Sequence, residues 1–198
     1  MHFTTRGLTG AAALLAAGLA LPALAEGPRY TYGELGYQRV DFDNFSEDED
    51  AGYLTGSLGL NDRLFLAADA SYGTIDVSGS DIDVTTVEAG LGMHLPLNDK
   101  VDFVAGVAYV YIDVSSDAFN NSQDEDGYAL RGGLRAMVTP KLELNGGATY
   151  VDVVDDDTSA YFGAVYNFTD AFAVSGNVDV GDNATTYGVG LRLYFDAR

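Results

Sequence analysis

Seven charged residues are candidates for an enclosed interior face, and each is flanked on both sides by an apolar residue or glycine. Glu88, for example, lies between Val87 and Ala89. Side chains of an extended strand point alternately to its two faces, so each charge is expected on the face opposite to its apolar neighbours. Where such faces enclose an interior, opposite charges are expected to pair, because an unpaired charge in a poorly hydrated space is costly. The seven residues are Glu34, Asp69, Glu88, Arg131, Arg135, Asp179 and Arg192.

Acidic residues gather in the polar segments between these alternating stretches. Runs of like charge are usually solvated loops. Clustered carboxylates also offer oxygen ligands to hard divalent cations, which can bridge to anionic lipid headgroups. No segment fits the calcium-loop pattern D-x-[DN]-x-[DN]-G, so no metal site is predicted. The acidic residues, all expected in extracellular loops, are Glu47, Asp48, Glu49, Asp50, Asp124, Glu125, Asp126, Asp155, Asp156 and Asp157.

Long strands of alternating character must position these residues. Apolar residues recur at every second position for about the 9 to 11 residues that a tilted strand needs to cross a membrane. The opposite positions hold glycine, small residues and isolated charges. Ten strands are predicted, an even count typical of bacterial single-chain barrels, with eight as the alternative. Their expected ranges are 30–42, 52–60, 64–73, 87–95, 103–111, 130–136, 142–150, 160–168, 172–180 and 187–195.

No apolar stretch in residues 26–198 is long enough to span a bilayer as a helix. In lipid, only helices and closed barrels satisfy every backbone polar group. The predicted fold is therefore all-β, an antiparallel up-and-down transmembrane β-barrel over residues 26–198. A soluble sandwich or barrel is the competing interpretation. The many glycines on the second face disfavour it, because glycine weakens a strand.

Residues 1–25 are predicted to be a cleaved secretory signal peptide. Arg6 precedes an apolar run that ends at Leu21, and the small residues Ala23 and Ala25 suit cleavage after Ala25. An anchor helix is the alternative, but Pro22 interrupts a run that is short of the ~20 residues of a spanning helix.

Short turns alternate along the chain with longer connections, which are expected at 44–51, 76–81, 115–127, 155–159 and 181–183. Short turns normally face the periplasm, so both termini are expected there, and Tyr30 and Tyr32 are expected in an aromatic girdle at that end. Asp179 and Arg192 lie on adjacent predicted strands, and barrel closure brings Glu34 beside the strand of Arg192. A salt-bridged plug is therefore expected inside, with an ion-selecting constriction as the functional alternative.

Composition excludes several classes of function. The net charge is −20 with only 10 lysines and arginines, so nucleic acid is not an expected partner. Cysteine is absent, which removes disulfides, thiolate metal sites and a cysteine nucleophile. No cofactor is expected.

The sequence resembles the small Gram-negative outer-membrane barrels of the OmpA and OmpX type. The resemblance rests on the predicted signal, the strand pattern and the closing segment Gly190–Phe195, in which Leu191, Leu193 and Phe195 alternate. It implies residence among outer-membrane lipid and lipopolysaccharide, and recognition of Gly190–Phe195 by the barrel-assembly machinery. Enzymatic barrels place catalytic groups, usually including a histidine, at the extracellular rim. His94 is expected at the other end, so no enzyme is predicted, although an acid-only site of loop aspartates stays open.

Two functional hypotheses remain. The first is a small porin-like barrel whose acidic loops favour cations, with narrow conductance or none, since about eight strands leave an interior just filled by side chains. The second is a non-conducting surface barrel whose acidic loops contact cells, cations or lipopolysaccharide. The sequence alone does not decide between them.

Overall fold

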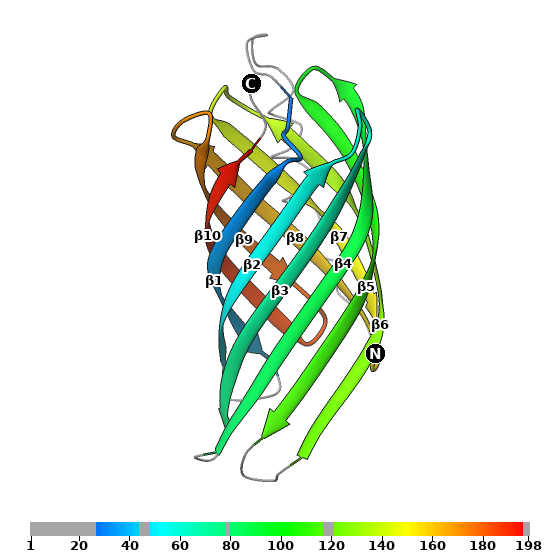
Figure 1. The fold of residues 1–198 in the computed structure, drawn as a ribbon, viewed down its shortest axis with the longest axis vertical. Coiled ribbons are helices and arrows are strands. Elements are labelled where there is room, and N and C mark those ends of the chain that lie inside the picture. Colours follow the sequence, from blue (N-terminus) through cyan, green and yellow to red (C-terminus); the bar gives the residue numbers. More distant parts are fainter. Residues whose placement is uncertain (1–26, 44–47, 78–79, 117–120, 196–198) are drawn as a thin grey trace, which may run out of the picture.

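The computed structural model describes residues 27–43, 48–77, 80–116 and 121–195, which form a closed antiparallel barrel (Figure 1). The predicted all-β barrel of ten strands is confirmed, and the alternative of eight strands is wrong. The predicted signal peptide lies outside the described residues. The strands are β1 (Tyr32–Phe42), β2 (Glu49–Gly59), β3 (Leu64–Val77), β4 (Ser80–Asn98), β5 (Val101–Ser116), β6 (Asn121–Met137), β7 (Leu142–Asp152), β8 (Asp156–Asn167), β9 (Phe172–Val180) and β10 (Ala184–Tyr194).

Closure depends on the seam between the first and last strands. β1 pairs with β10 from Tyr32 opposite Tyr194 to Phe42 opposite Ala184. Each of the remaining strands, β2 to β9, pairs with its two neighbours in sequence. The sheet therefore has no open edge, which is the condition for a sheet to lie in lipid.

β3 to β6 exceed their expected lengths the most. β4, β5 and β6 contain 19, 16 and 17 residues, and only residues 78–79 separate β3 from β4. The expected loops at 76–81 and 115–127 are therefore largely strand, a correction. β-Branched residues such as Thr85, Thr86 and Ile112 lie between the predicted strands and these loops, and they favour strand pairing whether or not one face is apolar. The β3–β4 and β5–β6 hairpins accordingly project below the other strands in Figure 1.

Most of the acidic residues expected in loops lie in strands, which is a second correction. Their backbones pair with a neighbouring strand beyond the apolar part of the wall, where polar side chains on both faces meet water. Glu47 lies outside the described residues. The positions are β6 for Asp124, Glu125 and Asp126, the start of β2 for Glu49 and Asp50, the start of β8 for Asp156 and Asp157, the turn before β8 for Asp155, and the residue before β2 for Asp48.

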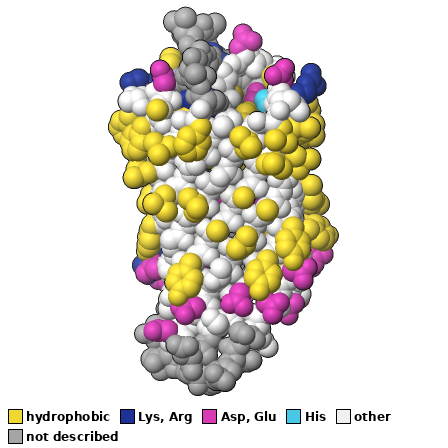
Figure 2. Space-filling view, viewed as in Figure 1, with side chains coloured by type: hydrophobic (Ala, Val, Ile, Leu, Met, Phe, Trp, Pro, Cys, Tyr) yellow, Lys and Arg dark blue, Asp and Glu magenta, His cyan; other side chains and the backbone are white. Residues whose placement is uncertain are grey.

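The two ends of the barrel differ in chemistry. At one end, named here the turn end, the described chain begins and finishes beside the short turns 60–63, 99–100, 138–141 and 168–171. The opposite end, named the acidic end, carries residues 48–50, 124–126 and 155–157. Figure 2 shows acidic side chains gathered at this lower rim and apolar side chains over the wall above it.

The outer wall is apolar on the faces that the alternation predicts. Leu35, Leu66, Val107 and Leu191 are each at least 45 % exposed, whereas their neighbours in sequence point inward. Such an apolar surface is stable only where lipid covers it. No helix in the described part of the chain is long and apolar enough to cross a membrane.

Candidate functional site in the barrel lumen

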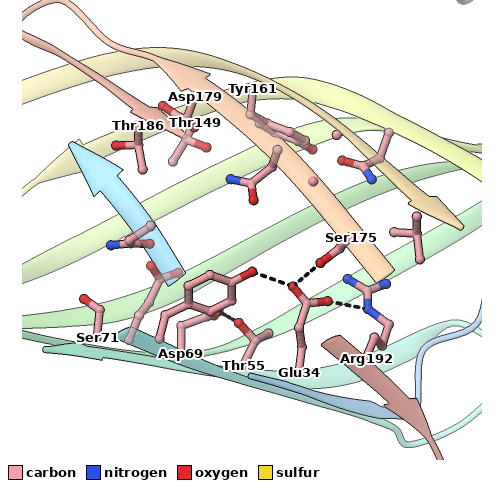
Figure 3. Close-up of a pocket in the computed structure, with 18 of the residues that line it drawn as sticks. Glu34, Thr55, Asp69, Ser71, Thr149, Tyr161, Ser175, Asp179, Thr186 and Arg192 are labelled. Atoms are coloured by element: carbon pink, nitrogen blue, oxygen red, sulfur yellow. Dashed lines mark hydrogen bonds and ion pairs between the residues drawn. The ribbon is translucent and has the colours of Figure 1, made fainter. Parts of the chain in front are cut away.

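The barrel encloses a polar cavity of about 520 Å³ (Figure 3). This volume is within the ~300 to 1,000 Å³ of typical small-molecule sites. The cavity extends from the middle of the barrel toward the acidic end, where Asp179 and Thr186 lie near the ends of their strands. Six of the seven predicted lumen charges line it, namely Glu34, Asp69, Glu88, Arg131, Asp179 and Arg192.

Glu34 and Arg192 form an ion pair across the seam between β1 and β10. They are direct cross-strand partners, and Arg192 Nε donates to Glu34 Oε2 at 2.6 Å. The hydroxyls of Tyr53 and Ser175 donate to Glu34 Oε1 at 2.9 and 2.8 Å. Both charged side chains are at most 10 % exposed, so these bonds replace the water that burial removes.

Inward-facing glycines make room for the aromatic side chain in this network. Tyr53, Gly36, Gly190 and Ser175 form one row of direct partners across β2, β1, β10 and β9. A Cβ atom at Gly36 would overlap the Tyr53 ring, and one at Gly190 would lie 2.5 Å from the Tyr53 hydroxyl oxygen. The two glycines therefore let the ring lie flat across the wall and reach Glu34.

Arg131 and Glu88 form the second ion pair in the cavity. Two contacts of 2.7 Å join the guanidinium to both carboxylate oxygens, a bidentate geometry. The Arg131 side chain is 44 % exposed, so cavity solvent reaches this pair. Asp69 accepts a hydrogen bond of 2.7 Å from the Thr55 hydroxyl instead of pairing with an arginine.

Asp179 does not pair with Arg192, although their strands are adjacent as predicted. The register places Asp179 opposite Thr186, and Arg192 opposite Ala173. Among the described residues, no hydrogen bond or ion pair within 4.0 Å engages the Asp179 carboxylate. Asp179 is therefore a lumen charge that the protein itself leaves unpaired.

Arg135 lies closer to the turn end and pairs with Glu143, which sequence reasoning omitted from the network. Arg135 Nε and one terminal nitrogen donate to the two Glu143 oxygens at 2.8 and 3.0 Å. Glu143 is 1 % exposed. Because Leu142 and Leu144 flank it, the rule that selected the other seven charges would also have selected Glu143.

The chain segment before β1 inserts into the turn end. The Arg135 guanidinium lies 4.5 Å from the Tyr30 ring centre and donates to the Arg29 carbonyl at 3.0 Å. Arg29 in turn stacks 4.0 Å over the Tyr194 ring and donates to a backbone carbonyl of the 168–171 turn. We name Arg29, Tyr30, Arg135, Glu143 and Tyr194 the turn-end plug. All five side chains are nearly inaccessible to solvent.

Tyr30 fills the centre of this end. Its ring stacks on His94 at 4.0 Å and on Phe65 at 5.0 Å between ring centres. Its hydroxyl donates to Asp102 Oδ2 at 2.7 Å, and its carbonyl accepts from Ser57. The expected place of Tyr30 and Tyr32 in an outer girdle is wrong, since Tyr32 also faces inward, with the Arg192 guanidinium 3.8 Å over its ring. Paired polar groups inside attract both rings more than the membrane interface does.

His94 lies inside the turn end, as expected for its position. Its Nδ1 is 3.0 Å from Asp102 Oδ2, close enough for an ion pair when the imidazole is protonated. The geometry does not make a hydrogen bond, so the short distance alone does not define an acid–base pair.

The acidic end has little positive charge to balance it. Arg39 is the one lysine or arginine there among the described residues, and it contacts Asp48 together with Asp41 and Asp50 at 3.6 Å each. The other described cations lie in the lumen or at the turn end. No group of three histidine or acidic side chains in the described ranges has the arrangement of a metal site.

Comparison with known proteins agrees with this architecture. The family model described as "Outer membrane protein beta-barrel domain" matches residues 11–195. No curated sequence matches the chain. The outer membrane protein OprG from Pseudomonas aeruginosa is 17 % identical with a TM-score of 0.50, and the match covers 88 % of this chain and 100 % of OprG.

Two other solved barrels resemble this chain in fold. The β domain of the Bordetella autotransporter BrkA is 11 % identical with a TM-score of 0.52, over 84 % of this chain and 99 % of that domain. Neisserial surface protein A is 16 % identical with a TM-score of 0.47, over 84 % of this chain and 96 % of that protein. At these identities the likeness concerns the fold alone.

Proposed function

Because the chain belongs to the outer membrane protein beta-barrel domain family, we propose that it is a narrow, cation-preferring porin-like barrel whose acidic end faces the cell exterior. The protein lies in the outer membrane, and in this orientation both termini are periplasmic. A solute from outside meets the acidic end first, then the cavity, and the turn-end plug last.

The charge distribution at the acidic end carries the proposal. Acidic residues of β2, β6 and β8 surround the entrance, and the single described cation there, Arg39, is held by aspartates. The summed negative field concentrates cations at the mouth. Inside, two of the four cavity carboxylates are matched by arginines, which leaves Asp69 and Asp179 in excess.

The turn-end plug limits the current. Its stacked rings and ion pairs occupy the end of the lumen beyond the cavity, so conduction in the described conformation is small or absent. Exposed charges are screened over about 8 Å at physiological ionic strength, so any selectivity should weaken as salt rises.

Planar-bilayer recording of the refolded protein tests the proposal. A potassium chloride gradient should give a reversal potential of cation-selective sign. Changing Asp155, Asp156 and Asp157 together to asparagine should reduce it. The matched control changes three exposed turn-end aspartates, Asp62, Asp99 and Asp170, and should have less effect. Anion selectivity of the unmodified protein would overturn the proposal.

The projecting hairpins favour a second function, a surface barrel without conductance. β3–β4 and β5–β6 extend beyond the other strands and carry residues 124–126 away from the wall (Figure 1). In this role their carboxylates contact divalent cations and, through them, lipopolysaccharide. Complete absence of current in well-folded protein, together with calcium-dependent binding to lipopolysaccharide vesicles, would favour it. Neither function requires catalysis by this chain.

The last strand supports a role in assembly. Leu191, Leu193 and Phe195 are at least 50 % exposed on the outer wall, while the residues between them face inward. This is the pattern in Gly190–Phe195 that barrel-assembly machinery would recognise. Leu193→Asp should therefore lower the yield of folded barrel in cells more than it lowers folding into detergent.

A further inference from the structure

One corner of the cavity, made by Thr149, Tyr161, Asp179 and Thr186, has polar groups without partners (Figure 3). We name it the Asp179 corner. Thr149 is only 6 % exposed, and its hydroxyl has no hydrogen-bond partner among the described residues. The Asp179 carboxylate is also unpaired, as described above. Both groups line the same cavity and neither is sealed off from it, so a solute in the cavity can bond to both at once.

The register gives the spacing of these groups. Thr186 and Tyr161 are the direct cross-strand neighbours of Asp179 on its two sides, where Cβ atoms are about 4.5 to 5.5 Å apart. Thr149 pairs with Ser159, two residues along β8 from Tyr161. With strands about 4.8 Å apart and a rise of about 3.4 Å per residue, the Cα atoms of Thr149 and Asp179 lie roughly 12 Å apart along the wall. A single ion cannot contact both residues, but a small molecule with two polar groups can.

Charge decides which polar group belongs at each position. The negative Asp179 carboxylate attracts a cation, and the neighbouring Thr186 has a hydroxyl oxygen that can accept a hydrogen bond from it. Thr149 is the direct partner of Arg131, so a cation at that position would be repelled. A neutral hydroxyl group suits Thr149 instead. Tyr161 extends from β8 across Gly147 toward Gly133, so its ring borders the corner on the side of Thr149.

We propose that the Asp179 corner binds a small amino alcohol. The ammonium group donates to the Asp179 carboxylate and the Thr186 hydroxyl, and the hydroxyl group bonds to Thr149. A bare metal ion is disfavoured, because no described group of three acidic or histidine side chains surrounds the corner. The inference rests on the proposed cation preference, and it names the class of cation that the lumen selects.

A titration with two matched ligands tests the site. The probes are 3-aminopropanol and n-butylamine, which have equal numbers of heavy atoms and differ by a hydroxyl in place of a methyl group. Amide chemical shifts of the refolded protein in detergent micelles report binding whether or not the barrel conducts. We expect a saturable shift at the Asp179 corner and an affinity for 3-aminopropanol about three- to tenfold higher than for n-butylamine.

Three variants separate the contacts. Thr149→Val keeps the shape of the side chain and should abolish the preference for 3-aminopropanol. Asp179→Asn should weaken both ligands about tenfold, because it removes a charged acceptor. Asp69→Asn makes the same charge change on another wall of the same cavity and should weaken both ligands much less.

The outcomes separate this proposal from the one before it. Equal weakening by Asp69→Asn and Asp179→Asn would mean that the general negative field binds amines, and it would overturn the site. An unchanged preference in Thr149→Val, or no saturable shift with 3-aminopropanol, would overturn it as well. Failure of cation selectivity in the bilayer recording with intact ligand binding would instead reject the proposed conduction alone.

Discussion

Two bidentate arginine–glutamate pairs in the lumen differ mainly in burial, so the same substitution in each should have different consequences. The Arg135 and Glu143 side chains are 13 % and 1 % exposed. The Arg131 and Glu88 side chains are 44 % and 11 % exposed. We predict that Glu143→Gln destabilises the barrel far more than Glu88→Gln does.

The expected losses of unfolding free energy follow from the partners that each arginine retains after the substitution. Removing one partner of a buried ion pair costs about 3 to 5 kcal/mol, because the remaining charge stays buried. Arg135 retains its bond to the Arg29 carbonyl, so the lower value of about 3 kcal/mol is expected for Glu143→Gln. Arg131 reaches cavity solvent, and after screening the loss for Glu88→Gln should be about 1 kcal/mol or less.

Urea unfolding of the barrel in lipid vesicles measures both changes, with the folded fraction read from the mobility of unboiled samples on gels. Equal losses of unfolding free energy for the two variants would refute the reasoning from burial. A rescue provides a further check, because Arg135→Met combined with Glu143→Leu removes both charges and should recover much of the loss.

Three further perturbations test the outer wall, the turn-end plug and the packing of Gly36 against Tyr53. Val107→Arg should cost about 2 to 4 kcal/mol in the same assay if the site lies near the midplane, whereas Val107→Leu should be nearly neutral, and the reverse order would place this residue in the lumen. Tyr30→Ala should cost about 3 kcal/mol and raise single-channel conductance, while Tyr187→Ala on the outer wall should leave conductance unchanged. Equal currents in both would show that Tyr30 does not close the turn end. Gly36→Ala should cost about 1 to 3 kcal/mol by overpacking against the Tyr53 ring. Tyr53→Ser in the same chain should relieve most of that penalty, and additive losses in this double-mutant cycle would contradict the contact.

The faces of the strands could be predicted from sequence because the period of two is a local property. Leu191 and Arg192 must point to opposite sides of β10 whatever the rest of the chain does. Partners across strands depend on register, which the turns set. The turn closed by the hydrogen bond from Gly181 N–H to the Ala184 carbonyl places Asp179 opposite Thr186, six residues before Arg192.

The insertion of Arg29 and Tyr30 into the turn end was only partly within reach of local reasoning. Tyr30 shares the parity of the inward Glu34, but Arg29 lies outside the predicted strand 30–42 and no pattern marks it as interior. Their positions depend on contacts with residues 65, 94, 135 and 194, which come from four different strands or their ends. The length of β4 to β6 was missed for a different reason. An apolar face was required of every strand, but strands that leave the membrane no longer need one.

Separation of the plug from the cavity makes binding and passage independently testable. The plug contacts that join Arg29 to the 168–171 turn, like the seam pair of Glu34 and Arg192, connect opposite ends of the sequence. The seam pair forms only when β10 has joined β1, and the Arg29 contact needs the 168–171 turn in place, so we expect plug insertion and barrel closure to be coupled. Asp179, by contrast, contributes no ion pair to either event. Its substitution should therefore change what the lumen binds without opening the turn end, whereas loss of Tyr30 should open that end without changing which solute binds.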